Sequence, residues 1–169
     1  MKTIIALGIA AAWMAAPAHA DICSDLHTIY AQSATQFASW KSGEGDAEST
    51  FPSSFVAVGA STCTIGEDPA SFSCIWKFGT PAAMDQAYRR MLGELESCRP
   101  LMKMSPEIKP TEPQELRAGA SLRKIELVGF DYLDADVMMM LGKEETSGMP
   151  DEFDLNGNKL TFTFVAPDH

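Results

Sequence analysis

Four cysteines constrain the fold of this chain more than any other feature of its sequence. They are Cys23, Cys63, Cys74 and Cys98, and complete pairing of four cysteines allows three connectivities. The spacing C-x-x-C does not occur, so the pattern indicates neither a zinc site nor a thioredoxin-like redox pair. An even number of cysteines predicts two structural disulfides if the chain reaches an oxidising compartment.

The first twenty residues predict export to such a compartment. Lys2 gives a basic start, Ile4–Ala16 is a short apolar run, and Ala18-His19-Ala20 has the small-x-small pattern of a signal-peptidase site. We therefore predict a cleaved signal peptide over residues 1–20 and a single mature domain over residues 21–169, located in the periplasm or secreted. The apolar run is short for a membrane span, and no later segment is long and apolar enough, so no span is expected after cleavage.

The segment between Cys63 and Cys74 predicts one of the two disulfides. Its centre contains Asp68-Pro69, which is typical of a turn. A hairpin that turns there places Cys63 directly opposite Cys74 and Ile65 opposite Phe72. We therefore predict a Cys63–Cys74 bond across the hairpin.

The remaining pair, Cys23 and Cys98, lies on two predicted helices. In the first, which follows the cleavage site, the apolar residues recur at helical spacing: Ile22, Leu26, Ile29, Tyr30, Phe37 and Trp40. The second begins with Pro81 in its first turn, ends before Pro100, and carries this stripe: Met84, Ala87, Tyr88, Met91, Leu95 and Cys98. A Cys23–Cys98 bond fits two helices that lie antiparallel on one face of a sheet.

Strand patterns fill most of the rest of the chain. We expect the sheet to begin at Phe55–Val58 after a solvated loop over 42–50, and the remaining strands at about 61–65, 71–78, 122–133, 137–141 and 160–165. Asn156-Gly157 is the strongest short hairpin signal, and 134–136 forms another turn. The proline-rich segment 99–118 is predicted to be an extended connection outside the sheet.

This order of elements predicts an α+β fold. The antiparallel sheet consists of the hairpin and a C-terminal meander, the two helices pack on one of its faces, and two disulfides staple it.

Charge and residue types exclude several functions. The net charge of −10 opposes binding to nucleic acid or to an anionic membrane surface. After cleavage only His27 and the terminal His169 remain, and there is no nucleophile elbow or glycine-rich phosphate loop. We therefore name no catalytic residue, no metal-ligand set and no cofactor, and an enzyme is the less favoured interpretation.

Methionine pairs leave a copper-binding alternative open. Met102 and Met104 alternate in the proline-rich segment, and alternate residues of an extended chain share a side. Soft thioether sulfur in an oxidising compartment selects Cu(I). The triplet Met138-Met139-Met140 is better explained as core packing in an apolar strand.

Carboxylates leave a second alternative open, an envelope hydrolase. Asp131, Asp134 and Asp136 could supply an acid/base pair, although the same residues suit a turn. The run Glu152–Asn158 resembles the front of a calcium-binding EF-hand loop, but the twelfth position is Thr163 rather than glutamate, which favours a hairpin turn.

The leading hypothesis is a non-catalytic binding protein of the inhibitor, immunity or accessory-chaperone type. Its expected partner is another envelope or secreted protein. The exposed connection from Arg99 to Ala118 is the predicted contact surface. The residues expected to make that contact are Met102, Met104, Pro106, Pro110 and Pro113.

Overall fold

The computed structural model describes residues 22–98, 102–104, 114–117, 120–132, 137–148 and 157–167. The predicted signal peptide over residues 1–20 lies outside the described residues, as do Pro106, Pro110 and Pro113.

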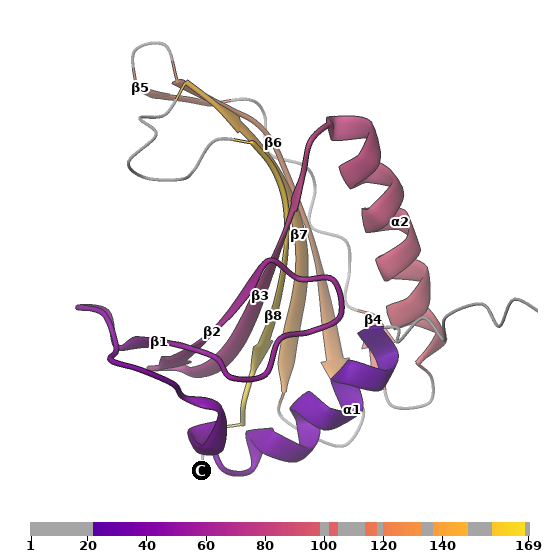
Figure 1. Cartoon of the computed structure of the whole chain (residues 1–169). Helices are drawn as coiled ribbons and strands as arrows, with labels where there is room; N and C mark the ends of the chain where they lie inside the picture. The colour runs from indigo at the N-terminus through magenta and orange to yellow at the C-terminus, as the bar shows by residue number, and fades with distance from the viewer. Residues whose placement is uncertain are drawn as a thin grey trace, which may run out of the picture.

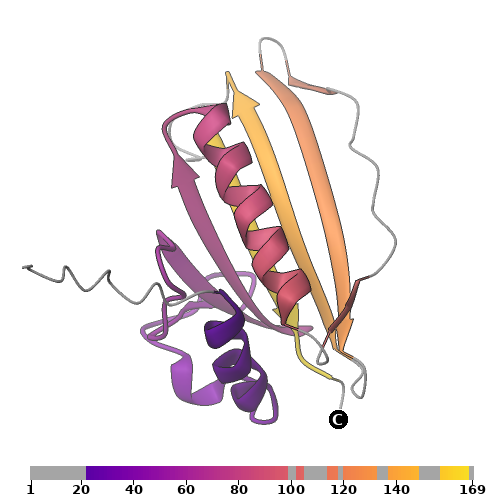
Figure 2. The ribbon, with the colours of Figure 1, turned by 90° about the vertical axis from the view of Figure 1, so that its right-hand side faces the viewer.

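The described strands form one antiparallel sheet, and helices α1 and α2 lie on the same face of it (Figures 1 and 2). The strand order is β1-β2-β3-β8-β7-β6-β4, and β5 also pairs with β6. The strands are β1 Thr50–Pro52, β2 Thr62–Glu67, β3 Ala70–Phe78, β4 Met102–Met104, β5 Gln114–Arg117, β6 Ala120–Tyr132, β7 Met138–Ser147 and β8 Gly157–Val165. This architecture confirms the predicted α+β class.

The β2–β3 hairpin has the predicted register. Cys63 lies opposite Cys74, Ile65 lies opposite Phe72, and Asp68-Pro69, joined by a cis peptide bond, forms the turn. Period-two alternation buries one face of β3 against the helices, and that face carries Phe72, Cys74 and Trp76.

Both predicted disulfides are present. Cys63–Cys74 crosses the hairpin with a Cα–Cα distance of 4.1 Å. Cys23–Cys98 joins the start of α1 (Ile22–Ser33) to the residue that caps α2 (Pro81–Ser97), with a Cα–Cα distance of 5.7 Å.

Helix α1 is shorter than the apolar spacing predicts, because it ends in a left-handed turn. The amide of Phe37 donates to the carbonyl of Gln32 at 3.2 Å, and the amide of Gln36 donates to that of Ser33 at 2.9 Å. Gln36 and Phe37 both have positive φ, at 51° and 57°. This is the Schellman arrangement that closes many helices. It reverses the chain so that Phe37 still enters the core, where it packs against Phe72 and Phe164.

Helix α2 forms as predicted. Thr80 caps its N-terminus by accepting a hydrogen bond from the amide of Ala83, and Pro81 occupies the first turn, where its missing N–H costs nothing. All the residues of the predicted stripe are buried: Met84, Ala87, Tyr88, Met91, Leu95 and Cys98.

The two helices are not antiparallel. In Figures 1 and 2, α1 begins beside the last turns of α2 and then runs on toward the same end of the sheet. A bond between the start of one helix and the end of the other is compatible with either arrangement, so the disulfide did not determine the direction.

The segment Phe55–Val58, predicted as the first strand, is a loop. The sheet instead begins at β1, which pairs with β2. The loop is held by side chains: the Phe55 ring stacks on Trp40 with centroids 4.3 Å apart, and Ala57 is buried. The predicted solvated loop at 42–50 is largely exposed.

The prediction of a two-residue hairpin turn at Asn156-Gly157 is wrong, because Gly157 belongs to strand β8. Gly157 is the first residue of β8 and lies opposite Thr146 of β7, so the connection comprises residues 148–156. Strand β7 also runs beyond the predicted end at Leu141, because β6 and β8 pair with its backbone on both sides regardless of its polar side chains.

Two parts of the proline-rich segment join the sheet, contrary to the prediction. Strand β4 pairs with β6 from Met102↔Tyr132 to Met104↔Phe130, and β5 pairs with the other end of β6. Both stretches lack proline, so their amides are available to an edge of the sheet.

Candidate ligand-binding pocket

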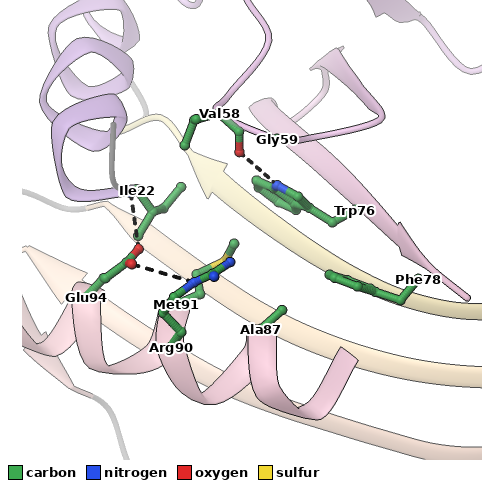
Figure 3. A pocket seen from close by; sticks show the side chains of 9 residues that line it. All are labelled: Ile22, Val58, Gly59, Trp76, Phe78, Ala87, Arg90, Met91 and Glu94. Carbon is green, nitrogen blue, oxygen red and sulfur yellow. Dashed lines mark hydrogen bonds and ion pairs between the residues drawn. The ribbon is translucent and has the colours of Figure 1, made fainter. Parts of the chain in front are cut away.

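A cavity of about 530 Å³ lies between α2, β3 and the loop that follows β1, beside the first residue of α1 (Figure 3). Its lining residues come from four separate parts of the chain: Ile22, Val58, Gly59, Trp76, Phe78, Ala87, Arg90, Met91 and Glu94.

Apolar side chains make up most of the lining. Trp76 and Phe78 are alternate residues of β3 and so project toward the helices together. Ala87 and Met91 are one turn apart on α2 and face them across the cavity (Figure 3). Ile22, buried at the start of α1, closes one end.

The loop at the mouth is held at Val58 by two distant elements. The Val58 amide donates to Oδ2 of Asp25 on α1 at 2.7 Å, and the Val58 carbonyl accepts from Nε1 of Trp76 at 3.0 Å. A turn from Ala57 to Ala60 follows, with Gly59 at φ 69°. The backbone beside the cavity is therefore fixed without regular secondary structure.

Two apolar side chains of this loop are nevertheless exposed. Val56 is 49% exposed and Val58 is 43% exposed. Val58 also lines the cavity, so its exposed side chain is one that a ligand or a partner could cover.

Two opposite charges lie at the rim, one turn apart on α2. Nε of Arg90 is 3.8 Å from Oε1 of Glu94, and the Ile22 amide donates to Oε2 of Glu94 at 3.5 Å. Both distances exceed the roughly 2.7–2.9 Å of a strong charge-assisted hydrogen bond. These contacts leave Glu94 only weakly engaged.

The two disulfides flank the pocket. Cys23 follows Ile22 directly, and its partner Cys98 lies one turn after Glu94, so this bond ties the two sides of the rim together. On the other side, Cys74 lies two residues before Trp76, and the sulfur of Cys63 accepts the Ala57 amide at 3.4 Å.

Of the predicted contact residues, the structure describes the backbone of Met102 and Met104. They are the ends of β4, which occupies the opposite end of the strand order from β1. The three prolines fall outside the described residues, so the contact surface from Arg99 to Ala118 and the copper site both stay predictions. The prediction that the triplet at 138–140 packs in the core is wrong for Met138, which is exposed, because the alternation of strand β7 turns Met139 inward instead, and Met139 is buried.

Sequence reasoning did not find the pocket. Trp76 and Phe78 fall in the strand predicted at 71–78, and Arg90 and Glu94 fall in the second predicted helix but outside its apolar stripe. Nothing in the sequence indicated that these two pairs lie close together. Pairs of charged residues one turn apart are common on helices, so Arg90 and Glu94 carried no local signal of a site.

Other chemical groups in the described residues are engaged or dispersed. All four cysteines are in disulfides, and His27 lies exposed on α1. Within the described ranges there is no cluster of three or more His, Cys, Asp or Glu residues that could hold a metal ion. In the same ranges, neither helix is long and apolar enough to cross a membrane.

No protein family, curated protein or solved structure was found to match this chain.

Proposed function

We propose that this protein is an exported binding protein whose pocket holds the apolar part of a small molecule. The observation that carries the proposal is the preformed cavity of about 530 Å³. This volume falls within the range of about 300–1,000 Å³ typical of small-molecule sites, which are likewise apolar with a few polar groups at the rim.

The chemistry of the lining supports binding more than catalysis. Among the described residues of the lining, Arg90 and Glu94 are the ionisable ones, and none is histidine, serine or cysteine. Trp76 is held by its bond to the Val58 carbonyl, so its ring presents a fixed apolar surface. A rigid wall lowers the entropic cost of ordering the site when a ligand binds.

Export is supported by the leader pattern of residues 1–20 together with the two disulfides, which persist in oxidising compartments. We place the protein in the periplasm or the extracellular medium. Cleavage after Ala20 would make Asp21 the first residue, adjacent in sequence to Ile22 of the pocket.

A protein partner is the second candidate, favoured by the exposed side chains of Val56 and Val58. An apolar side chain of an envelope or secreted protein would then enter the cavity from the side of this loop. The two candidates predict different results with purified protein. If the ligand is a small molecule, the protein binds an apolar small molecule in the absence of any other protein.

The test uses N-phenylnaphthylamine, a neutral apolar dye whose fluorescence rises when it leaves water. The protein is expressed with its leader and purified from the exporting host. We expect saturable binding at one site per chain. Ala87→Phe fills the cavity from a buried position of α2 and should abolish binding, whereas Ala83→Leu on the exposed face of the same helix should not.

Thermal unfolding of each variant shows whether it is folded. Absence of dye binding by the wild-type protein, or undiminished binding by a folded Ala87→Phe variant, contradicts the proposal. If Ala87→Phe does not fold, Met91→Trp, which fills the same cavity from the next turn of α2, replaces it in the comparison.

A further inference from the structure

We infer that the ligand of this pocket is a cation: an amphipathic molecule whose apolar chain fills the cavity and whose ammonium group meets Glu94. The inference rests on the proposed function and adds the charge of the ligand to it. Three observations favour a cation over an anion.

The first is the position of Glu94 at the rim. Its side chain is 31% exposed and points across the mouth toward Ile22, whereas the side chain of Arg90 is 71% exposed (Figure 3). The carboxylate is therefore the more enclosed of the two charges. A bound head group at the mouth meets it in a less polar setting, where electrostatic attraction is stronger.

The weak engagement of Glu94 strengthens this first point. Its contacts with the Arg90 guanidinium and the Ile22 amide measure 3.8 Å and 3.5 Å. An ionised carboxylate has about four lone-pair positions for hydrogen bonds. A ligand ammonium can therefore bind at short distance while Arg90 turns to solvent, and little existing bonding is lost.

The second observation is the aromatic wall. The indole N–H of Trp76 is already bonded to Val58, so what Trp76 offers to a ligand is its ring. Phe78 adds a second ring from the same strand face (Figure 3). Aromatic faces carry partial negative charge and attract ammonium groups, and tryptophan does so most strongly.

The third observation is the charge of the whole chain. At a net charge of −10, the protein attracts cations and repels anions over distances comparable to the Debye length. An anion bound at Arg90 would oppose both this field and the neighbouring Glu94 carboxylate.

The experiment compares three ligands with the same ten-carbon chain near neutral pH: decylammonium, decanol and decanoate. Each displaces N-phenylnaphthylamine from the wild-type protein below the concentration at which it forms micelles. We expect decylammonium to bind about tenfold more tightly than decanol, and decanoate to bind more weakly than either. Added salt should weaken the binding of decylammonium alone.

Matched variants assign the preference to Glu94. Glu94→Gln keeps the shape of the side chain and should lower decylammonium affinity about tenfold while leaving decanol affinity unchanged. Glu96→Gln removes the same charge from an exposed position two residues away and should have little effect. Decanol binding by Glu94→Gln also shows that this variant is folded.

The outcomes separate the two proposals. Equal affinity for all three ligands supports the proposed apolar binding pocket but overturns the inference that its ligand is a cation. Preference for decanoate that disappears in Arg90→Gln assigns the site to anions instead and also overturns it. Failure of all three ligands and the dye to bind overturns both proposals.

Discussion

Val58 is held by both of its backbone polar groups, and each bond goes to a side chain from another element. Asp25 on α1 accepts the bond from its amide, and Trp76 on β3 donates to its carbonyl. A loop residue normally satisfies these groups with water or with neighbouring backbone. Here the two bonds connect the helix, the loop and the wall of the pocket through one residue.

Gly59, which follows Val58, tests how far the shape of this loop depends on backbone conformation. Its φ is 69°, and a Cβ would lie 3.7 Å from Nε1 of Trp76, an ordinary contact distance. We predict that Gly59→Ala destabilises the fold by about 1 kcal/mol, because alanine disfavours positive φ. Urea denaturation measures the change.

Gly93 provides the matched control. It lies within α2, and a Cβ added there would meet open space, with no contact within 4 Å. Gly93→Ala should therefore stabilise the fold by about 0.5–1 kcal/mol, since alanine is the better helix former. Equal effects of the two substitutions would show that the conformation of Gly59 is not the cause.

At the scale of elements, an ion pair links α2 to the sheet within their otherwise apolar interface. Nζ of Lys143 on β7 lies 2.7 Å from Oδ1 of Asp85 and 4.9 Å from the ring centroid of Tyr88, both on α2. Lys143 is buried and lies on the face of β7 that carries Met139 and Leu141. A buried lysine needs such partners because the desolvation of its charge is costly.

We predict that Asp85→Ala destabilises the protein by about 2 kcal/mol, since it takes the carboxylate from a buried ammonium group. This is below the roughly 3–5 kcal/mol expected for a fully buried pair, because the side chain of Asp85 is 38% exposed. Lys143→Met keeps the apolar stem and removes the charge, so it should cost about 1 kcal/mol or less.

Urea denaturation again provides the measurement, with Gln86→Ala at an exposed position of α2 as the control for helix propensity. If Lys143→Met lowers the free energy of unfolding more than Asp85→Ala does, the lysine side chain itself stabilises the fold, and the role of Asp85 in compensating its charge is the smaller effect.

At the scale of the whole molecule, the two disulfides close loops of very different length. Cys23–Cys98 spans 75 residues and joins both helices, whereas Cys63–Cys74 spans 11 residues within one hairpin. Closing the longer loop removes more conformational entropy from the unfolded chain. The loop-length relation gives a stabilisation of about 4 kcal/mol for Cys23–Cys98 and about 3 kcal/mol for Cys63–Cys74.

We therefore predict that Cys23→Ala with Cys98→Ala lowers the melting temperature more than Cys63→Ala with Cys74→Ala. Alanine avoids placing a hydroxyl in the core, where Cys63 and Cys74 are buried. Thermal unfolding compares the two double variants, and non-reducing peptide mapping of the wild-type protein checks the pairing. If the Cys63→Ala, Cys74→Ala variant has the lower melting temperature, packing around the hairpin disulfide contributes more than the difference in loop entropy.

The sequence by itself determined the β2–β3 hairpin, α2 and both disulfides. In the hairpin, a turn dipeptide and residue alternation act over a few positions, so Cys63 had to meet Cys74. In α2, the Thr80-Pro81 start and the spacing from Met84 to Leu95 are also local. Once Cys63 is paired with Cys74, Cys98 is the only cysteine left to pair with Cys23.

Only the tertiary structure decided the pocket, the edge strand β4 and the Lys143–Asp85 contact. Ile22 and Glu94 are 72 residues apart, and Lys143 and Asp85 are 58 apart. No local sequence pattern predicts contacts between residues so far apart in the chain, because these contacts depend on how the helices pack on the twisted sheet. Local conformational preference shaped each element, whereas burial of apolar surface placed the elements together and enclosed the cavity between them.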